Sequence, residues 1–442
     1  MSLRRTNARA LAHAFLSGPW TLRVLLARGD FAVDAGGPWL RGLVEDVLST
    51  FPEAPLHRVE DVEAFIDANR HFDAAWRQRQ LPHATPRFLP FEPTMGPRRW
   101  DVPALATLRE LADWLGVSDE ELDWFADRRG LNGLTQASQL QHYRCVWLAR
   151  GPRLPRLLEA PKPRLRALQR KVLDEVLARV PAHDAAHGFV RGRSVLTHAA
   201  LHAGQPLVVR FDLAHFFSSV TVPLAHGLFR ALGYPREVAA TLLALCTTRT
   251  PEFVLRRAPF PEPLTARASG ERFHHQRLLA ERHLPQGAPT SPALANLVAY
   301  GLDVRLAGYA RARDLRYSRY ADDLVFSGAP RSVGPLCDFV RQVVREQGFR
   351  LNEAKTRVMR AQHRQHVTGL VVNAKPAVPR EAYDLLKARL HRCRRDGPRS
   401  LTPDVAALAA ELRGQIAWVT QSSPARGVKL RAVFDAIDWP IN

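Results

Sequence analysis

The chain contains the stretch Tyr317-Ser318-Arg319-Tyr320-Ala321-Asp322-Asp323-Leu324-Val325-Phe326. Apolar and β-prone residues stand on both sides of two adjacent aspartates. This pattern predicts a strand, a tight turn and a second strand, with the two carboxylates at the tip. Adjacent carboxylates repel each other unless a cation lies near them, and hard oxygen ligands suit Mg²⁺. Taken alone, the pair is explained as well or better by a solvated turn at the surface.

A third aspartate, Asp212, ends the short run Val208-Val209-Arg210-Phe211-Asp212, which is typical of a strand. Together with Asp322 and Asp323 it gives three carboxylates. This is the set that two Mg²⁺ ions, about 3.5–4 Å apart, need in order to activate a 3′-hydroxyl and stabilise a leaving pyrophosphate. Without the other two, Asp212 could instead be a helix N-cap.

A further element is the loop Leu284-Pro285-Gln286-Gly287-Ala288-Pro289-Thr290-Ser291-Pro292. Glycine and proline bound the loop, and a helix is predicted to begin at Pro292 with Ser291 in the capping position. Such a loop can approach a base pair and a triphosphate closely. An ordinary loop before a helix has the same pattern, so the element does not indicate a function by itself.

Basic residues outnumber acidic ones by a wide margin. The 442 residues include 63 Lys and Arg against 43 Asp and Glu, which gives a formal net charge of +20. A surplus of this size favours a polyanionic partner, most simply nucleic acid. Part of the arginine content reflects a composition rich in Ala, Arg and Leu, but that bias does not explain the sign of the net charge.

The four cysteines are far apart and form no Cys-x-x-Cys pair: Cys145, Cys246, Cys337 and Cys393. This spacing argues against a zinc site or a disulfide framework and fits a reducing cytoplasm. No stretch approaches the roughly 20 apolar residues that a membrane-spanning helix needs. We therefore expect a soluble, cytoplasmic protein without a membrane partner.

Apolar periodicity divides the chain into four parts. Residues 1–95 predict a helical N-terminal extension, whose role no motif indicates, and residues 96–140 predict a helical pair or linker. Residues 141–374 alternate short β-type runs with helices, and residues 375–442 return to basic amphipathic helices. The expected fold class is therefore α+β with a mainly helical N-terminal extension.

Two local features of the first 140 residues are specific enough to test. Prolines cluster where the extension ends and predict a linker or surface loop: Pro82, Pro86, Pro90, Pro93 and Pro97. An apolar stripe predicts a helix from Val102 to Leu115, and Ser118 with Glu121 predicts a capping box for the next helix.

The three motif elements occur in the order Phe-Asp-x-x-x-Phe-Phe, Leu-Pro-Gln-Gly-x-x-x-Ser-Pro and Tyr-Ala-Asp-Asp, which resembles the palm motifs of reverse transcriptases. Segments 156–170, 187–194 and 351–356 resemble the fingers segment and two further blocks of the bacterial enzymes. The resemblance covers roughly residues 140–440. It implies a right-hand polymerase with fingers and palm in 141–374 and a helical basic thumb in 375–442.

Within that family the chain most resembles retron reverse transcriptases. Gln-Gly-Ala-Pro-Thr-Ser-Pro at 286–292 and Val367-Thr368-Gly369 carry this resemblance. Retron enzymes also tend to have Asn-Ala-x-x-His. Here His198-Ala199-Ala200-Leu201-His202 stands in that place, with His198 where the pattern has Asn.

The resemblance implies a role for each matching residue. Asp212, Asp322 and Asp323 are the expected catalytic residues and would bind two Mg²⁺ ions, with Mn²⁺ able to substitute. The Leu213 carbonyl is a further expected metal ligand.

Five residues match nucleotide-binding positions of the family. Phe217 matches the steric gate that selects dNTPs over rNTPs, and Arg156 matches the fingers arginine that clamps the triphosphate. Gln286 and Gly287 match the loop near the incoming nucleotide. Lys355 would either protonate the leaving pyrophosphate or neutralise phosphate charge.

Retron enzymes bind and copy part of a structured RNA encoded beside them. The resemblance therefore implies a cognate non-coding RNA as template and primer, dNTPs as substrates and a DNA product. The expected RNA-binding residues are His198, His202, Val367, Thr368 and Gly369. Priming from a guanosine 2′-hydroxyl would give branched RNA–DNA (msDNA) as part of antiphage defence, and an effector, if present, would be a separate protein.

Two other hypotheses remain open. The first is another bacterial reverse transcriptase, group II intron-like or defence-associated, that makes no branched product. The second is a catalytically idle RNA-binding protein that kept the polymerase fold. The intact set Asp212, Asp322, Asp323, Gln286 and Phe217 argues against the second hypothesis.

Overall fold

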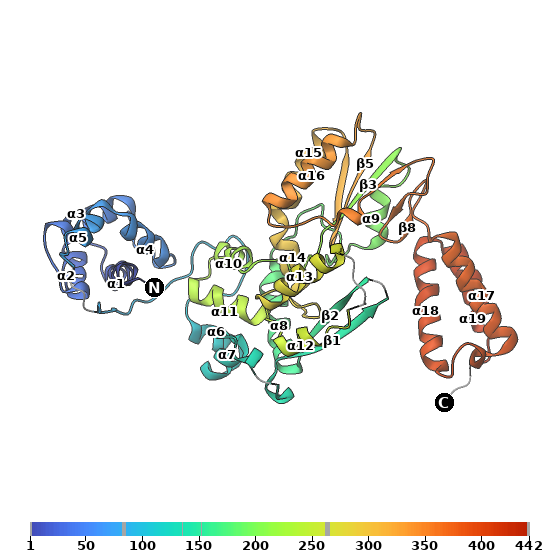
Figure 1. Ribbon diagram of the computed structural model, residues 1–442, viewed down its shortest axis with the longest axis horizontal. Helices are drawn as coiled ribbons and strands as arrows, with labels where there is room; N and C mark the ends of the chain where they lie inside the picture. The colour runs from blue at the N-terminus through green and yellow to red at the C-terminus, as the bar shows by residue number, and fades with distance from the viewer. Residues whose placement is uncertain (1, 82–84, 135, 152, 261–265, 440–442) are drawn as a thin grey trace. The chain divides into compact units, whose positions relative to one another are not determined.

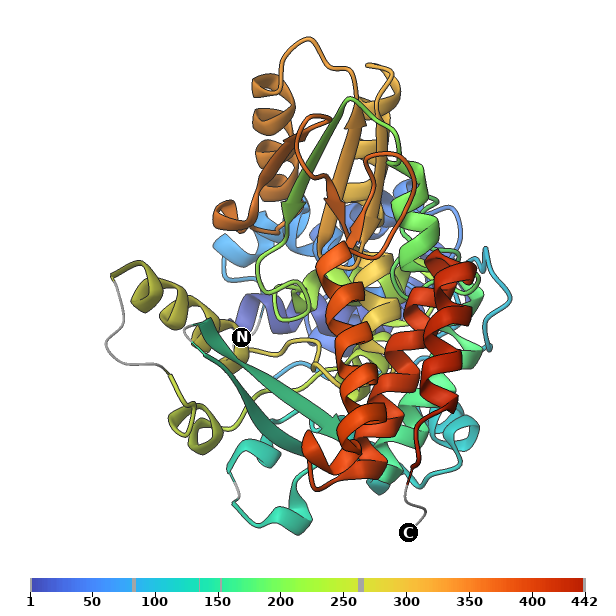
Figure 2. The ribbon, with the colours of Figure 1, turned by 90° about the vertical axis from the view of Figure 1, so that its right-hand side faces the viewer.

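The structure is a computed structural model that describes residues 2–81, 85–134, 136–151, 153–260 and 266–439. Its chain forms two units (Figures 1 and 2). Unit 1 comprises Met1–Val180 and Val222–Thr290, and unit 2 comprises Pro181–Thr221 and Ser291–Asn442. Each unit is therefore built from two separate stretches of the chain.

Five helices form a bundle at the start of unit 1: α1 (Leu3–Leu16), α2 (Leu22–Val33), α3 (Pro38–Thr50), α4 (Val59–Ala68) and α5 (Arg70–Arg77). Apolar residues at helical spacing make a core of their own, which includes Leu11, Phe15, Leu43, Ile66 and Phe72. Burial of this stripe, rather than intrinsic propensity, holds short helices together. The expected helical character of the extension is confirmed.

The next part of unit 1 has little regular structure before α6 (Leu108–Leu115) and α7 (Asp119–Ala126). Both helices begin with a capping box, and the predicted Ser118–Glu121 box is one of them. The helix expected from Val102 begins only at Leu108, because Thr107 and Glu110 cap it there. Pro82 lies outside the described residues, and the other four prolines lie in the irregular stretch.

The rest of unit 1 contains one hairpin and several helices. Strands β1 (Tyr143–Arg150) and β2 (Arg153–Pro161) pair in antiparallel fashion. The helices are α8 (Pro163–Glu175), α10 (Val222–Ala231), α11 (Arg236–Cys246), α12 (Glu252–Arg256) and α13 (Ala266–Ala280).

Unit 2 is built on an antiparallel sheet with the strand order β4-β5-β3-β6. Its strands are β3 (Leu207–Asp212), β4 (Arg316–Tyr320), β5 (Asp323–Gly328) and β6 (Arg357–Arg360), and a separate small hairpin pairs β7 (His366–Val367) with β8 (Leu370–Val371). Around them lie α9 (Val195–Leu201), α14 (Ser291–Val298), α15 (Tyr300–Arg311) and α16 (Gly334–Glu346). The three helices after the sheet are α17 (Arg380–Asp396), α18 (Val405–Ser422) and α19 (Pro424–Asp435).

The apolar core of unit 2 joins the sheet to the C-terminal helices. Val208 and Val325 from the sheet belong to the same cluster as Leu370, and that cluster continues through Leu412 and Phe434. Mixed sheet and helix packing of this kind confirms the α+β class expected from the sequence.

Candidate active site

Strand pairing brings the three aspartates together. In the antiparallel β3–β5 pair, Asp212 lies opposite Asp323, and the Leu213 amide donates a hydrogen bond to the Asp322 carbonyl at 2.8 Å. Directly opposed residues of an antiparallel pair have their side chains within about 5 Å of each other. The two motifs, far apart in sequence, therefore place their carboxylates at one end of the sheet.

The turn before Asp322 is tight and closely packed. Ala321 has a φ of 54°, in the left-handed region that few non-glycine residues adopt. Gly188 lies against this turn, and a Cβ at that position would come within 2.5 Å of the Ala321 nitrogen. The His-Gly-Phe block at 187–189 thus needs its glycine because the backbone of the catalytic turn occupies the space.

A buried arginine, Arg319, stabilises the turn at Ala321. The Arg319 side chain is 0% exposed, pairs with Asp303 of α15 through Nη2 at 2.6 Å, and donates through Nη1 to the Ala321 carbonyl at 3.2 Å. Asn296 of α14 accepts from the same Nη1 at 2.8 Å. One guanidinium therefore ties two helices to the residue that precedes Asp322.

The backbone of Arg319 extends this network. Its amide donates to the Ala185 carbonyl, and its carbonyl accepts from the His187 amide, both at 2.7 Å. The Asn296 side chain donates to the Gly188 carbonyl at 2.8 Å. Sequence reasoning missed this network. A signal for it was the arginine three residues before Asp322, in a strand that the sequence predicts.

The carboxylates strongly influence one another. Burial raises the pKa of Asp323 to about 6, and the Asp322 and Asp212 charges act in the same direction. Arg210, whose Nε lies 3.7 Å from the Asp323 Oδ1, opposes this shift. The Lys355 Nζ lies 2.8 Å from both carboxylate oxygens of Asp212. The site is therefore a concentration of negative charge beside which two side-chain cations, Arg210 and Lys355, already lie.

This donor set fits a hard divalent cation. Among the described residues, no group of three or more His, Cys, Asp or Glu side chains is arranged to hold a metal ion as it stands. The Lys355 ammonium contacts the Asp212 oxygens that a cation would use, and its side chain is 44% exposed. It is therefore free to swing away. Burial is the main cause of the raised pKa of Asp323, and the Asp322 and Asp212 charges add to it, so a cation bound among these oxygens would be favoured.

Phe217 lies five residues beyond Asp212 and is half-buried. Its ring packs against Phe216, with centroids 5.6 Å apart, and against Phe189, with centroids 6.0 Å apart. Phe189 is itself 52% exposed and has a φ of 62°. The expected gate residue, Phe217, thus packs between two rings, and one of them, Phe189, follows Gly188 in the sequence.

The expected nucleotide-binding residues of unit 1 gather around Glu159 of β2. The Glu159 amide donates to the Gln286 carbonyl at 2.8 Å. Gly287 has a φ of 135°, and a Cβ there would lie 3.0 Å from the Glu159 carbonyl. Arg156, three residues earlier on β2, is exposed. The structure therefore places the Gln286–Gly287 loop against Glu159, on the strand that also carries Arg156, within unit 1. Unit 2 holds the other expected residues: Asp212, Leu213, Phe217, Asp322, Asp323 and Lys355.

The Glu159 carboxylate is buried and doubly bound. It accepts from the Thr250 hydroxyl at 2.7 Å and from the His283 Nε2 at 2.8 Å. The His283 Nδ1 faces the Glu281 carbonyl at 2.8 Å, so both ring nitrogens have acceptors and the imidazolium is favoured. Burial alone lowers the pKa of His283, but the Glu159 charge and these hydrogen bonds raise it above its ordinary value.

This ion pair makes stability pH-dependent. Because the folded pKa of His283 exceeds its unfolded value of about 6.5, the stabilisation is fully present below that pH and is lost as pH rises through the folded pKa. We expect wild type and His283→Gln to differ most in urea midpoint near pH 6 and progressively less as the pH rises above the ordinary histidine pKa. A difference that stays constant over this range would contradict a charged His283.

Comparison with known proteins places the chain in a family. A family model described as reverse transcriptase (RNA-dependent DNA polymerase) matches residues 151–372. The retron Mx65 reverse transcriptase of Myxococcus xanthus is 38% identical over 365 residues, which cover 82% of this chain and 78% of that protein. The retron Mx162 reverse transcriptase of the same species is 39% identical over 340 residues, covering 73% of this chain and 65% of that protein. This chain belongs to the retron reverse transcriptases.

Other relatives agree over shorter lengths. The retron Ec86 reverse transcriptase of Escherichia coli is 32% identical to this reverse transcriptase over 238 residues, which cover 53% of this chain and 64% of that protein. The chain thus spans a little under two thirds of the Mx162 and Ec86 proteins. A telomerase structure from Candida albicans, in complex with a fragment of telomeric RNA, aligns with 66% of this chain and 56% of that chain, at 9% identity and a TM-score of 0.35.

The family assignment confirms the recognition made from the motifs and the right-hand polymerase fold that it implies. Reverse transcriptases are RNA-directed DNA polymerases that use divalent metal ions. In the part of this reverse transcriptase that the structure describes, no helix is both long and apolar enough to cross a membrane.

Three of the expected RNA-binding side chains are buried in the reverse transcriptase, and their role toward RNA stays a prediction. His198, His202 and Val367 are each 0% exposed. The His202 ring bridges the Ser318 and Ser327 hydroxyls at 2.7 and 2.8 Å. Burial, with the neighbouring His198, lowers the pKa of His202 well below its ordinary value, so the ring is neutral. His202 thus ties its block to two strands of the sheet, β4 and β5.

Thr368 and Gly369 differ from those three. They form the turn between β7 and β8, with φ values of 45° and 84°, and Gly369 is exposed. The Thr368 hydroxyl lies 3.4 Å from the His198 Nδ1. His198, which replaces the usual Asn, therefore links its own block to this turn, and the turn remains available at the surface.

Proposed function

We propose that this reverse transcriptase copies a cognate structured non-coding RNA into DNA. Synthesis would start from a guanosine 2′-hydroxyl and leave a branched RNA–DNA product as part of an antiphage retron. The observation that carries the polymerase activity is the pairing of Asp212 with Asp323 beside Asp322 at one end of the sheet. The similarity to retron enzymes supports the choice of RNA template.

Asp212, Asp322, Asp323 and the Leu213 carbonyl would hold two Mg²⁺ ions, for which Mn²⁺ can substitute. Such ions activate the attacking hydroxyl and neutralise charge on the leaving pyrophosphate. Lys355 would release Asp212 when these ligands engage and would then neutralise, or protonate, the pyrophosphate. Arg156 would bind the triphosphate, while Gln286 and Gly287 would place the nucleotide against the template.

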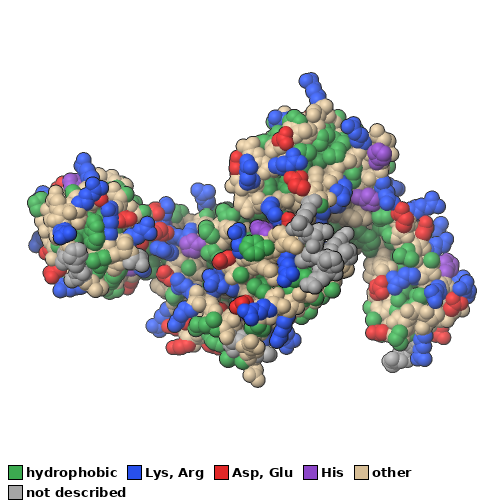
Figure 3. Space-filling model, viewed as in Figure 1, with side chains coloured by type: hydrophobic (Ala, Val, Ile, Leu, Met, Phe, Trp, Pro, Cys, Tyr) green, Lys and Arg blue, Asp and Glu red, His purple; other side chains and the backbone are tan. Residues whose placement is uncertain are grey.

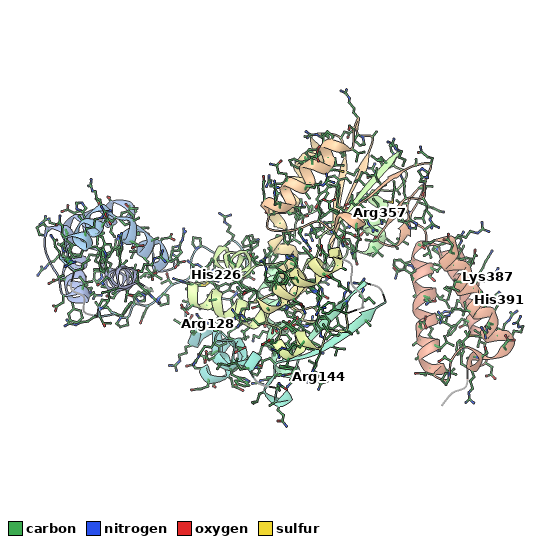
Figure 4. The ribbon with its side chains drawn as sticks, viewed as in Figure 1. Arg128, Arg144, His226, Arg357, Lys387 and His391 are labelled. Atoms are coloured by element: carbon green, nitrogen blue, oxygen red, sulfur yellow. The ribbon has the colours of Figure 1, made fainter. Side chains whose placement is uncertain are left out.

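The sequence divisions remain part of the proposal. Residues 141–374 would supply fingers and palm, 375–442 the thumb, and 1–95 with 96–140 a helical extension of unassigned role. Lys387 and His391, four residues apart on α17, project from the same side of that helix (Figure 4) and would face the nucleic-acid backbone. Lys and Arg side chains are also spread across the face shown in Figure 3, which suits a polyanionic partner. The protein would act in the cytoplasm, with any effector as a separate protein.

The half-buried position of Phe217 gives a prediction about sugar selection. Phe217→Ala is expected to raise the efficiency of rNTP use relative to dNTP use by roughly 10- to 100-fold, because removing the ring opens space for a 2′-hydroxyl. Single-nucleotide incorporation with matched dNTP and rNTP measures the ratio. Phe217→Tyr keeps the ring and should keep the preference. An unchanged ratio in Phe217→Ala would remove Phe217 as the gate.

The proposed function is tested by the nucleic acid that the protein carries. The gene should be expressed with several hundred bases of its upstream DNA, and the nucleic acid bound to the purified protein sequenced with and without debranching enzyme. A discrete single-stranded DNA joined to RNA, absent from the Asp322→Asn/Asp323→Asn variant, would support the proposal. DNA without a branch would indicate a different bacterial reverse transcriptase, and RNA without DNA would favour an RNA-binding protein.

A further inference from the structure

Unit 1 contains a cavity of about 510 Å³ between α12 and α13, which we call the α12–α13 pocket. Its lining residues recur at helical spacing on the facing sides of the two helices, together with Phe260 from the segment after α12: Glu252, Leu255, Arg256, Arg272, Phe273, Gln276, Arg277 and Ala280. The volume falls within the usual range for small-ligand sites, about 300–1,000 Å³, and is enough for one nucleotide but not for a duplex.

The pocket has a fixed base. The Trp147 indole of β1 donates to the Val254 carbonyl of α12 at 2.9 Å. Val254 also packs with Leu279 of α13 and Leu157 of β2 in a small core of their own. The pocket is therefore attached to the same hairpin that carries Arg156.

The charge of the pocket is positive. Glu252 pairs with Arg256 one helical turn away, which neutralises both. Arg272 and Arg277 form no ion pair within the part of the chain that the structure describes. Arg272 instead lies over the Phe260 ring, 4.3 Å from its centroid. Two guanidinium groups are thus available to an anion, and Arg is well suited to bind phosphate.

An aromatic ring stands exposed beside these cations. Phe273 is 71% exposed, although a phenyl side chain is favoured by burial away from water. Phe260, by contrast, is covered by Arg272 and by Trp147, whose centroid is 6.3 Å away. Exposed aromatic faces beside free arginines are the combination that binds single-stranded nucleic acid, where bases stack on rings and cations follow the backbone.

We propose that the α12–α13 pocket binds one nucleotide of a single-stranded nucleic acid, with the base stacked on Phe273 and the phosphate held by Arg272 and Arg277. The proposal rests on the proposed function only in taking nucleic acid as the partner. The strand is the RNA template ahead of synthesis or the single-stranded DNA product, since both offer a stacking base and a phosphate. Every base has a π-face, so the site has little sequence preference.

Binding of labelled single strands to the full-length protein tests the pocket. Mixed-sequence RNA, DNA of the same sequence and a blunt duplex are titrated against wild type and Phe273→Ala. We expect Phe273→Ala to weaken single-strand binding by roughly 5- to 100-fold and to leave duplex binding unchanged. A loss confined to RNA or to DNA identifies the strand, and either result supports the site. Phe273→Trp should retain binding.

The arginines are tested through salt dependence. Arg272→Gln with Arg277→Gln should lower the magnitude of the slope of log affinity against log salt by about 0.7, because one phosphate contact is lost. Phe31→Ala is the matched control for Phe273→Ala, because Phe31 is a 50% exposed phenyl on the N-terminal bundle. Its loss should leave the affinity for single strands unchanged.

DNA synthesis on a short primer–template distinguishes failure of the pocket proposal from failure of the proposed polymerase function. Phe273 is exposed and outside the catalytic machinery, so Phe273→Ala should fold and extend such a primer at the wild-type rate. If Phe273→Ala bound both single strands with wild-type affinity and still synthesised DNA, the proposal that the pocket binds a nucleotide would be wrong. The proposed polymerase activity would stand. Absence of synthesis in wild type on every template would instead remove the proposed function.

Discussion

Replacing Asp322 and Asp323 together by asparagine is expected to lower the rate of DNA synthesis by at least about 10³-fold, since several kcal/mol of transition-state stabilisation depend on the bound cations. The fold should survive this change. Asparagine is nearly the same size and removes the repulsion that, with burial, raises the pKa of Asp323 to about 6. Primer extension under single-turnover conditions measures the loss.

The same double substitution should raise the stability of the metal-free protein while it lowers activity. A folded pKa above the ordinary aspartate value means that ionising Asp323 destabilises the fold, and this destabilisation is present above about pH 6 and absent below about pH 4. In the presence of EDTA, the variant should therefore be more stable than wild type by about 1–3 kcal/mol at pH 8 and similar to it at pH 4. Added Mg²⁺ should raise the Tm of wild type only.

The control for this pair is Asp338→Asn, because Asp338 is an exposed carboxylate of α16 in the same unit. Its removal should leave synthesis unchanged. Two results would contradict the assignment of the three aspartates: synthesis within tenfold of wild type in the double asparagine variant, or an equal Mg²⁺-dependent rise in Tm for both proteins.

Sequence reasoning reached the elements that depend on local patterns. The hairpin that carries Asp322, the strand that ends at Asp212 and the cap at Ser118 each follow from a short run of residue types. The boundary at Leu108 was missed by several residues, because the Thr107–Glu110 box overrides the apolar stripe that begins at Val102.

What the sequence could not show depends on contacts between distant segments. Nothing local indicates that β3 lies between β5 and β6, or that Gly188 must be glycine because the Ala321 backbone lies against it. The same limit explains why the burial of His202 was not predicted. A histidine near the end of a short helix appears available to RNA until the sheet hydroxyls of Ser318 and Ser327 are seen to enclose it.

Arg319→Met is expected to cause the largest loss of stability among single substitutions in the catalytic core. It leaves the Asp303 carboxylate buried without its cation, and breaking a buried pair in this way costs about 3–5 kcal/mol. It also removes the donor to the Ala321 carbonyl, so the turn that positions Asp322 is freed. The urea midpoint and the rate of DNA synthesis, measured at a temperature where the variant is folded, should both fall.

A second substitution separates support of the fold from support of the turn. Arg319→Met with Asp303→Asn removes the unpaired charge but keeps an oxygen to accept the Tyr317 hydroxyl, which lies 2.8 Å from Asp303. Part of the lost stability should return, at least about 1–2 kcal/mol, because no charge remains buried. Synthesis should stay at least tenfold below wild type and require more Mg²⁺ for half-maximal rate, since no donor holds Ala321.

The matched control is Arg305→Met, on the same helix as Asp303. Arg305 pairs with Glu346 at the surface, where an ion pair contributes at most about 1 kcal/mol, so both stability and synthesis should change little. If the double variant recovered synthesis together with stability, Arg319 would serve the fold alone. If synthesis and its Mg²⁺ requirement stayed impaired while stability returned, Arg319 would position the turn before Asp322, through its contacts to the Ala321 carbonyl and the Asn296 side chain.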